Sequence, residues 1–202
     1  QSSMFGRGNK LLPLKKDIRT LAVIGPNADN VYNMLGDYTA PQADGTVVTV
    51  LDGIRQKVSK ETRVLYAKGC AVRDSSRTGF KDAIETARNA DAVVMVMGGS
   101  SARDFSSEYE ETGAAKVTIN QISDMESGEG YDRATLHLMG RQLELLEEIS
   151  RLGKPVVLVL IKGRPLLMEG AIQEAEAIVD AWYPGMQGGN AVADVLFGDY
   201  NP

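Results

Sequence analysis

Two apolar runs, at residues 92–97 and 155–161, constrain the fold of this 202-residue chain more than any other feature. A strand with one face in water alternates apolar and polar residues, whereas these runs contain no polar side chain. Strands of that kind lie in a largely parallel sheet that is covered on both faces. The chain therefore needs helices on both sides of a central sheet.

Shorter apolar runs at residues 21–24, 63–67 and 177–182 are each closely followed by glycine or proline. Between the runs, apolar residues recur at helical spacing, and Thr49 is a candidate N-cap for the first of these helices. Strands and helices that alternate in this way predict a three-layer α/β/α sandwich with a mostly parallel five- to six-stranded sheet. We expect residues 11–202 to form one domain, and we set residues 1–10 aside as a cloning remnant or cut edge.

The composition excludes several classes of function. A net charge of −5 provides no basic surface for nucleic acid, and no apolar run approaches the ~20 residues of a membrane span. The single cysteine, Cys70, rules out an internal disulfide framework and a multi-cysteine metal site, and we interpret it as a small buried hydrophobe. We therefore expect no metal, no cofactor, no nucleic acid partner and no membrane partner.

The segment after the run at 92–97 is the most informative place to look for chemistry, because open α/β sheets bind ligands beyond the carboxyl ends of their strands. Residues 98–133 far exceed the roughly 12–15 residues above which an irregular loop is usually functional or disordered. This segment is rich in carboxylates, which suits carboxylate catalysis or hydroxyl recognition. Composition alone favours a plain solvated loop.

Other familiar sites have no support in the sequence. No phosphate-binding glycine motif and no nucleophile elbow follows a strand. The only histidine, His137, has no second histidine or suitable cysteine to complete a metal site, and we assign it no role. Trp182 is interpreted as a residue at the edge of the core, with stacking on a ligand ring as the alternative.

The sequence Gly128-Glu129-Gly130-Tyr131-Asp132-Arg133 resembles a loop motif in the C-terminal α/β domain of glycoside hydrolase family 3, the β-glucosidase and β-xylosidase family. Three other segments resemble that domain in the same order: residues 11–14 with 24–28, residues 153–157 with 163–165, and residues 182–202. The resemblance covers nearly the whole chain beyond its first ten residues.

The resemblance implies the second domain of a retaining exo-β-glycosidase that removes terminal β-D-glucosyl or similar residues from a β-linked oligosaccharide or glycoside. Its relatives begin with a (β/α)8 barrel that carries the nucleophilic aspartate, so we expect this chain to be cut at both ends and to be inactive alone. The family's sixth strand is expected beyond Pro202. A periplasmic or secreted parent is a guess from the family, and the sugar and linkage cannot be read from this chain.

By position in the motif, the resemblance assigns the general acid/base to Glu129, with Glu126 and Glu111 on the same loop as alternatives. The glycines on either side of Glu129 allow unusual backbone angles and a close approach to substrate. We expect Asp132 and Arg133 to anchor the loop, and Arg133 is also a candidate for substrate contact. The alternative function is a non-catalytic carbohydrate- or protein-binding module. Nucleotide binding has the right architecture but lacks a phosphate fingerprint.

Overall fold

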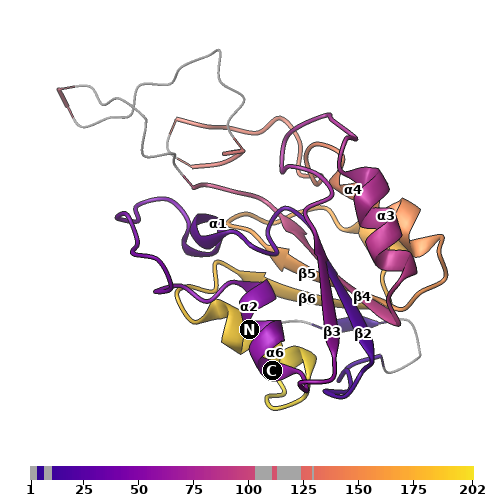
Figure 1. The fold of residues 1–202 in the computed structure, drawn as a ribbon. Coiled ribbons are helices and arrows are strands. Elements are labelled where there is room, and N and C mark those ends of the chain that lie inside the picture. Colours follow the sequence, from indigo (N-terminus) through magenta and orange to yellow (C-terminus); the bar gives the residue numbers. More distant parts are fainter. Residues whose placement is uncertain (1–3, 7–10, 103–110, 113–123, 129) are drawn as a thin grey trace.

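The computed structural model describes residues 4–6, 11–102, 111–112, 124–128 and 130–202. Its elements follow one another as β1 (Met4–Gly6), β2 (Thr20–Ile24), α1 (Val31–Leu35), α2 (Val50–Lys57), β3 (Arg63–Ala67), α3 (Phe80–Arg88), β4 (Ala92–Gly98), α4 (Gln142–Ser150), β5 (Val156–Ile161), α5 (Glu169–Glu174), β6 (Ala177–Trp182) and α6 (Gly188–Leu196). Figure 1 shows α3 and α4 on one side of the sheet and α2 and α6 on the other.

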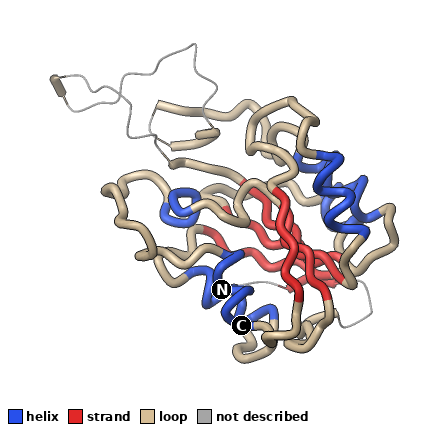
Figure 2. The backbone as a smooth tube through the Cα atoms, in the orientation of Figure 1, coloured by secondary structure: helices blue, strands red, loops and turns tan. Residues whose placement is uncertain are grey.

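Within the described residues, the strands form one six-stranded sheet in the order β1-β6-β5-β4-β2-β3. Every neighbouring pair from β6 to β3 is parallel, and only β1 runs antiparallel, against β6. The strands form a central layer with helices on both faces (Figure 2). The predicted three-layer, mostly parallel sandwich is therefore confirmed.

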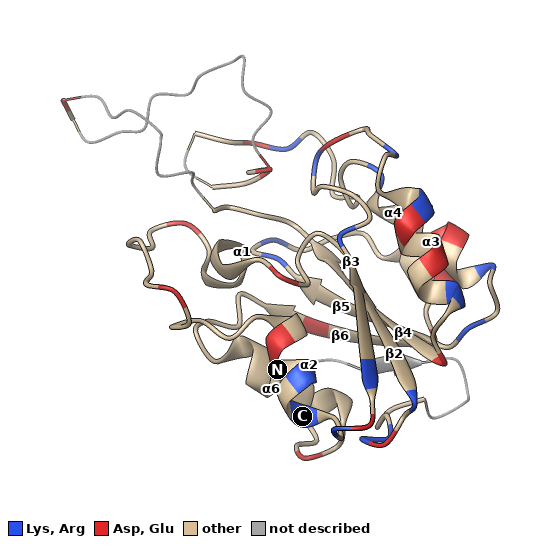
Figure 3. Ribbon diagram, in the orientation of Figure 1, with Lys and Arg blue, Asp and Glu red and all other residues tan. Residues whose placement is uncertain are grey.

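Successive residues of β4 point into two different cores. Val94 and Val96 pack with apolar residues of α2 and α6, while Met95 and Met97 pack with those of α3 and α4. All seven residues of β4 are buried, as are all six of β5. Figure 3 shows these two strands free of charged residues, whereas α2, α3 and α4 carry several. Burial on both faces explains the unbroken apolar runs.

The start of α2 agrees with the sequence pattern. Thr49 caps α2, and its hydroxyl oxygen accepts a hydrogen bond from the amide of Asp52 at 3.2 Å. The short helices α1 and α5 were not predicted. The side chain of Asn30 caps α1, accepting from the amide of Asn33 at 2.9 Å, and such a single turn leaves no apolar period to detect.

Within the described residues, the sixth strand of the sheet comes from residues 1–10, the segment set aside as a cloning remnant or cut edge. Met4 pairs with Val179 and Gly6 with Ala177 at the outer edge of β6. A strand of three residues has no periodicity of its own, because its structure depends on pairing with a strand far along the chain. Within the described residues, no helix has both the length and the apolar composition that a bilayer span requires.

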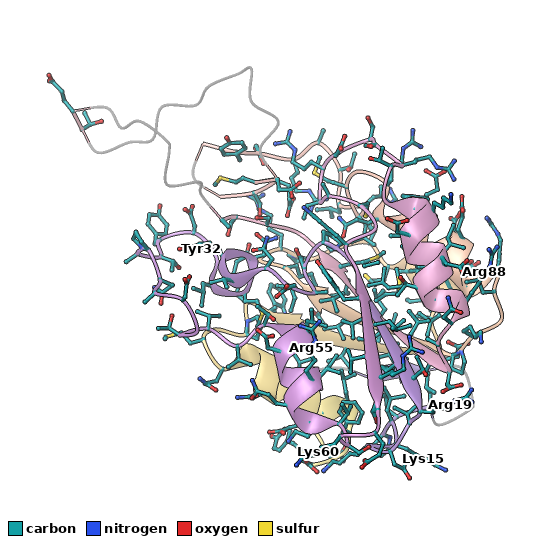
Figure 4. All side chains as sticks on the ribbon, in the orientation of Figure 1. Lys15, Arg19, Tyr32, Arg55, Lys60 and Arg88 are labelled. Carbon is teal, nitrogen blue, oxygen red and sulfur yellow. The ribbon has the colours of Figure 1, made fainter. Side chains whose placement is uncertain are left out.

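An ion-pair cluster ties α2 to the end of the chain, at the edge of the sheet away from the carboxyl ends of the strands. Lys57 lies between Asp194 and Asp199, and Lys16 also pairs with Asp199. Figure 4 shows Lys15, Arg19 and Lys60 at this same end of the sheet, opposite Tyr32. Hydrogen bonds from Lys16 and then Lys57 lower the pKa of Asp199, and hydrogen bonds to Asp194 and then Asp199 raise the pKa of Lys57.

These two pKa shifts predict a pH-dependent contribution to stability. The depressed pKa of Asp199 stabilises the fold above the carboxyl's unfolded pKa of about 4, and that contribution is lost as the pH falls through the folded pKa. The raised pKa of Lys57 acts below its unfolded pKa of about 10.4 and is lost as the pH rises past the folded value. We expect Lys57→Met to lower the Tm of the chain at pH 7, with a deficit that shrinks below about pH 4.

Thermal denaturation across pH 3–8 measures this effect. Arg88→Met is the control, because the one ion pair of Arg88 with a described residue is its exposed pair with Glu85 within α3. A Lys57→Met deficit that stays constant between pH 7 and pH 3 would show that lost packing, and not the ion pairs, causes it.

Candidate functional site

The candidate site lies at the carboxyl edge of the sheet, where the long loop after β4 leaves and returns. Of the three acids proposed from the sequence, Glu129 falls outside the described residues, and Glu111 is at the surface. Glu126 is buried, with 3% of its surface exposed. The structure thus places the two alternatives in opposite environments.

The residues on either side of position 129 belong to a tight reversal of the chain. Gly128 and Tyr131 face each other in an isolated antiparallel bridge, and the amide of Tyr131 donates to the carbonyl of Gly128 at 3.1 Å. Gly128 has φ 123° and Gly130 has φ 81°, a region that L side chains rarely adopt. A Cβ at Gly128 would also lie 2.6 Å from Met125 Cε. The expectation that these glycines supply unusual backbone angles is confirmed.

A buried ion pair joins the two sides of this reversal. Arg133 Nη1 lies 2.8 Å from Glu126 Oε2, and the two side chains are 3% and 1% exposed. Arg133 Nη2 also donates to the carbonyl of His137. The predicted anchoring role of Arg133 is therefore seen in the structure as an ion pair.

Glu126 is in turn held by the end of β4. Its amide donates to the carbonyl of Ser100 at 2.8 Å, and Ser127 Oγ donates to its Oε1 at 3.3 Å. Oε1 occupies space that any side chain at Gly99 would need, because a Cβ there would lie 2.0 Å away. The glycine after β4 thus makes room for the carboxylate.

A buried chain of amide and hydroxyl groups fixes the ends of β2, β4 and β5 relative to one another. Asn27 Nδ2 donates to the carbonyls of Gly99 and Ile161 at 3.1 and 3.2 Å. Asn33 Nδ2 donates to Asn27 Oδ1 at 2.7 Å, and Ser100 Oγ donates to Asn33 Oδ1 at 2.6 Å. The sequence analysis missed this network, although Asn27, directly after the Gly25-Pro26 pair that follows β2, was a usable signal.

Tyr183 fills the space between the loop and the end of β6. Its hydroxyl is buried, and Gly163 leaves no room for a side chain there because a Cβ would lie 2.5 Å from the phenol oxygen. Burial raises the pKa of Tyr183, the nearby hydroxyls of Ser101 and Ser127 partly oppose this, and the carboxylates of Glu126 and Asp37 add to it. The phenol is accordingly neutral and acts here as a wall of the site.

Trp182 is more exposed than its interpretation as a core-edge residue suggests. It is 42% exposed and has φ 55°, the only non-glycine residue with positive φ in the described part of the chain. The buried ammonium of Lys162 lies 3.8 Å from the centre of its ring and 2.9 Å from Asp180 Oδ2. This cation–π contact holds the indole at the carboxyl end of the sheet.

The returning half of the loop is tied to neighbouring loops. The carboxylate of Asp124 accepts from the amide of Val72 at 3.0 Å, and Arg73 Nη1 donates to the carbonyl of Met125 at 2.7 Å. Asp132 lies 3.5 Å from Arg164, but its side chain is 93% exposed, so this pair contributes little. Among the described residues, no group of three or more potential ligands could hold a metal ion.

Cys70 lies beside this edge and is buried, as predicted. Burial raises the pKa of its thiol to about 12, and the carboxylate of Asp124 acts in the same direction. Because the thiolate is the reactive form, we expect the native chain to resist iodoacetamide at pH 8 and to react once unfolded in urea. Mass spectrometry of the alkylated chain measures this, and stoichiometric labelling without urea would contradict the burial of Cys70.

The fold and the site together define a three-layer α/β/α sandwich domain with a carboxylate-bearing loop at the carboxyl edge of its sheet. The family model "Glycosyl hydrolase family 3 C-terminal domain" matches residues 7–202. The chain therefore belongs to glycoside hydrolase family 3 and corresponds to the C-terminal domain of that family.

Similar proteins agree with this assignment. The chain is 41% identical to a β-xylosidase from Formosa agariphila, with 98% of the chain and 25% of the relative covered. It is 35% identical to a periplasmic β-glucosidase from Salmonella typhimurium, with 95% and 24% covered. Among solved structures, it matches a β-glucosidase from Erythrobacter marinus with a TM-score of 0.78 and 32% identity, covering 100% of the chain and 27% of that structure. The chain spans about a quarter of the length of the curated relatives it matches.

Proposed function

We propose that this chain is the second domain of a retaining exo-β-glycosidase and that Glu129 is the general acid/base. The observation that supports this most directly is the glycine-framed reversal from Gly128 to Tyr131 at the carboxyl edge of the sheet. A carboxylate carried between these glycines can project toward another domain, since neither neighbour has a side chain to obstruct it.

The environments of the alternative acids favour the same assignment. Glu126 is committed to Arg133 in a buried pair, so its carboxylate cannot reach a substrate oxygen without breaking that pair. A retaining glycosidase uses two carboxyl groups about 5–5.5 Å apart, one as nucleophile and one as acid/base. In this proposal the nucleophile comes from the barrel domain of the parent, which the chain does not contain.

Docking of the barrel against the loop would give Glu129 the properties of an acid. Desolvation raises the pKa of a carboxyl group, and an acid/base must be protonated when it meets the leaving oxygen. The names of the relatives suggest terminal β-xylosyl or β-glucosyl residues as substrates. The chain alone should not turn over either one.

The test compares Glu129→Gln with Glu111→Gln in the full-length parent, with xylobiose and cellobiose as substrates. Glu111 is an exposed acid of the same loop and serves as the matched control. We expect Glu129→Gln to abolish most of the activity and Glu111→Gln to retain it. Wild-type turnover by Glu129→Gln would reject the assignment and favour a non-catalytic binding module.

A further inference from the structure

We propose that Arg133 and Glu126 are positioning residues that set the location of the acid/base, a role that rests on the proposed function of Glu129. The two residues flank the Gly128–Tyr131 reversal on either side. Their ion pair at 2.8 Å links the incoming and outgoing legs of that reversal. The pair thus limits how far the two legs of the reversal can separate.

The Glu126–Arg133 pair removes two charges from water, which offsets much of what it contributes to stability. We infer that its role is to fix the position of the loop. Both side chains are almost completely removed from water. Within the described residues, Glu126 Oε2 and Arg133 Nε make no aligned hydrogen bond that would offset this desolvation. Buried ion pairs of this kind can often be replaced by apolar residues without loss of stability, so stability alone does not account for one here.

The contacts form a continuous path from the sheet to the reversal. Ser100, two residues after the end of β4, accepts the amide of Glu126 at its carbonyl, and the space left by Gly99 receives the Glu126 carboxylate. Glu126 holds one nitrogen of Arg133, and the other nitrogen donates to the carbonyl of His137. A rigid, planar guanidinium can reach both partners at once, whereas a lysine ammonium on a flexible stem cannot hold both in place.

Loss of this path should misplace the acid/base without removing it. A displacement of about 1 Å at a catalytic group can cost on the order of 100-fold in rate. The cost falls on substrates whose leaving group needs a proton, because an activated phenolate departs without one. The ratio of kcat/KM for the two substrate types therefore reports positioning, and it does not change with the fraction of enzyme that is folded.

The experiment uses the full-length parent with 2,4-dinitrophenyl β-xyloside and β-glucoside against xylobiose and cellobiose. We expect Arg133→Met to raise the ratio of activated to natural substrate by about 10- to 100-fold. Arg133→Lys should raise it less, because one contact can survive. Asp132→Asn is the matched control, since Asp132 is the exposed neighbour in the same loop, and its ratio should stay at the wild-type value.

The double variant Glu126→Leu/Arg133→Met separates positioning from structural support. It removes both charges together, so the fold should be retained even if Arg133→Met alone is unstable. The proposal expects the double variant to keep a raised ratio despite a Tm near wild type. A wild-type ratio in Arg133→Lys and in the double variant would overturn it.

Glu129→Gln in the same assay tests the acid/base role of Glu129 separately from the positioning role of Glu126 and Arg133. If Glu129→Gln raises the ratio and the Arg133 variants do not, the acid/base assignment stands and the positioning role is wrong. If Glu129→Gln leaves the ratio unchanged, the proposed function itself fails.

Discussion

Glu129→Ala in the full-length parent should turn over an activated aryl glycoside slowly and regain rate when azide is added. The first step of a retaining mechanism needs a proton only for a poor leaving group, so 2,4-dinitrophenolate should still depart. The second step needs a base to activate water, so the glycosyl-enzyme should accumulate. Azide needs no base and would attack this intermediate from the same face as water.

General acid/base catalysis typically contributes 10²- to 10⁴-fold, which sets the expected loss of kcat/KM on xylobiose or cellobiose at about that size. The activated substrate should show a burst of phenolate followed by a slow steady state, measured by stopped-flow absorbance. The product formed with azide should be the β-glycosyl azide, identified by NMR.

Glu126→Ala provides the comparison within the same loop. It should lower activity by disturbing Arg133, but Glu129 is still present as a base, so azide should raise its rate far less than that of Glu129→Ala. Azide rescue of Glu126→Ala instead of Glu129→Ala would exchange the roles of the two residues.

The sequence predicts the central strands of this fold well because their burial leaves little choice of residue. β4 and β5 are covered on both faces, so every position is apolar and the run is visible without alignment. The strand β1 and the helices α1 and α5 leave no such trace. β1 exists through its register with β6, and α5 is a six-residue helix that packs against α4.

The candidate site is predictable only in part, for the same reason. The loop and its glycines can be read along the chain, because Gly128 and Gly130 mark a backbone that other residues rarely adopt. The partnership of Glu126 with Arg133 cannot be read along the chain. The loop offers several acids, and only the packing at Gly99 shows which of them is buried. The cation–π contact between Lys162 and Trp182 likewise depends on the register of β5 and β6, which brings the two residues together.

A second large effect is expected where α2 crosses α6, which lies on the face of the sheet opposite α3 and α4. A Cβ at Gly53 would lie 2.1 Å from the carbonyl oxygen of Gly189, and a Cβ at Gly189 would lie 2.0 Å from that of Thr49. The helix backbones touch here, and the amide of Gly189 donates to the carbonyl of Val48 at 3.0 Å. Backbone atoms cannot move aside as a side chain can.

We therefore expect Gly53→Ala to destabilise the chain, although alanine is favoured over glycine by about 1 kcal/mol inside a helix. Overpacking a rigid contact typically costs about 1–3 kcal/mol, and more where backbone must shift, so the clash should outweigh the helical preference. With backbone on both sides of the contact, a clash of about 3–4 kcal/mol less the helical preference of about 1 kcal/mol leaves a net loss of about 2–3 kcal/mol. At roughly 2–4 °C per kcal/mol for a chain of this size, this loss lowers the Tm by about 4–12 °C.

Gly170→Ala in α5 is the matched control, because it makes the same substitution in a helix against a neighbour that can move. Its Cβ would meet Leu143 Cδ2 at 3.0 Å, the end of a flexible side chain. The change in Tm should therefore be small. Equal Tm values for Gly53→Ala and Gly170→Ala would contradict this prediction. They would mean that α2 and α6 lie further apart than the structure places them, and that the face of the sheet under these helices is packed differently.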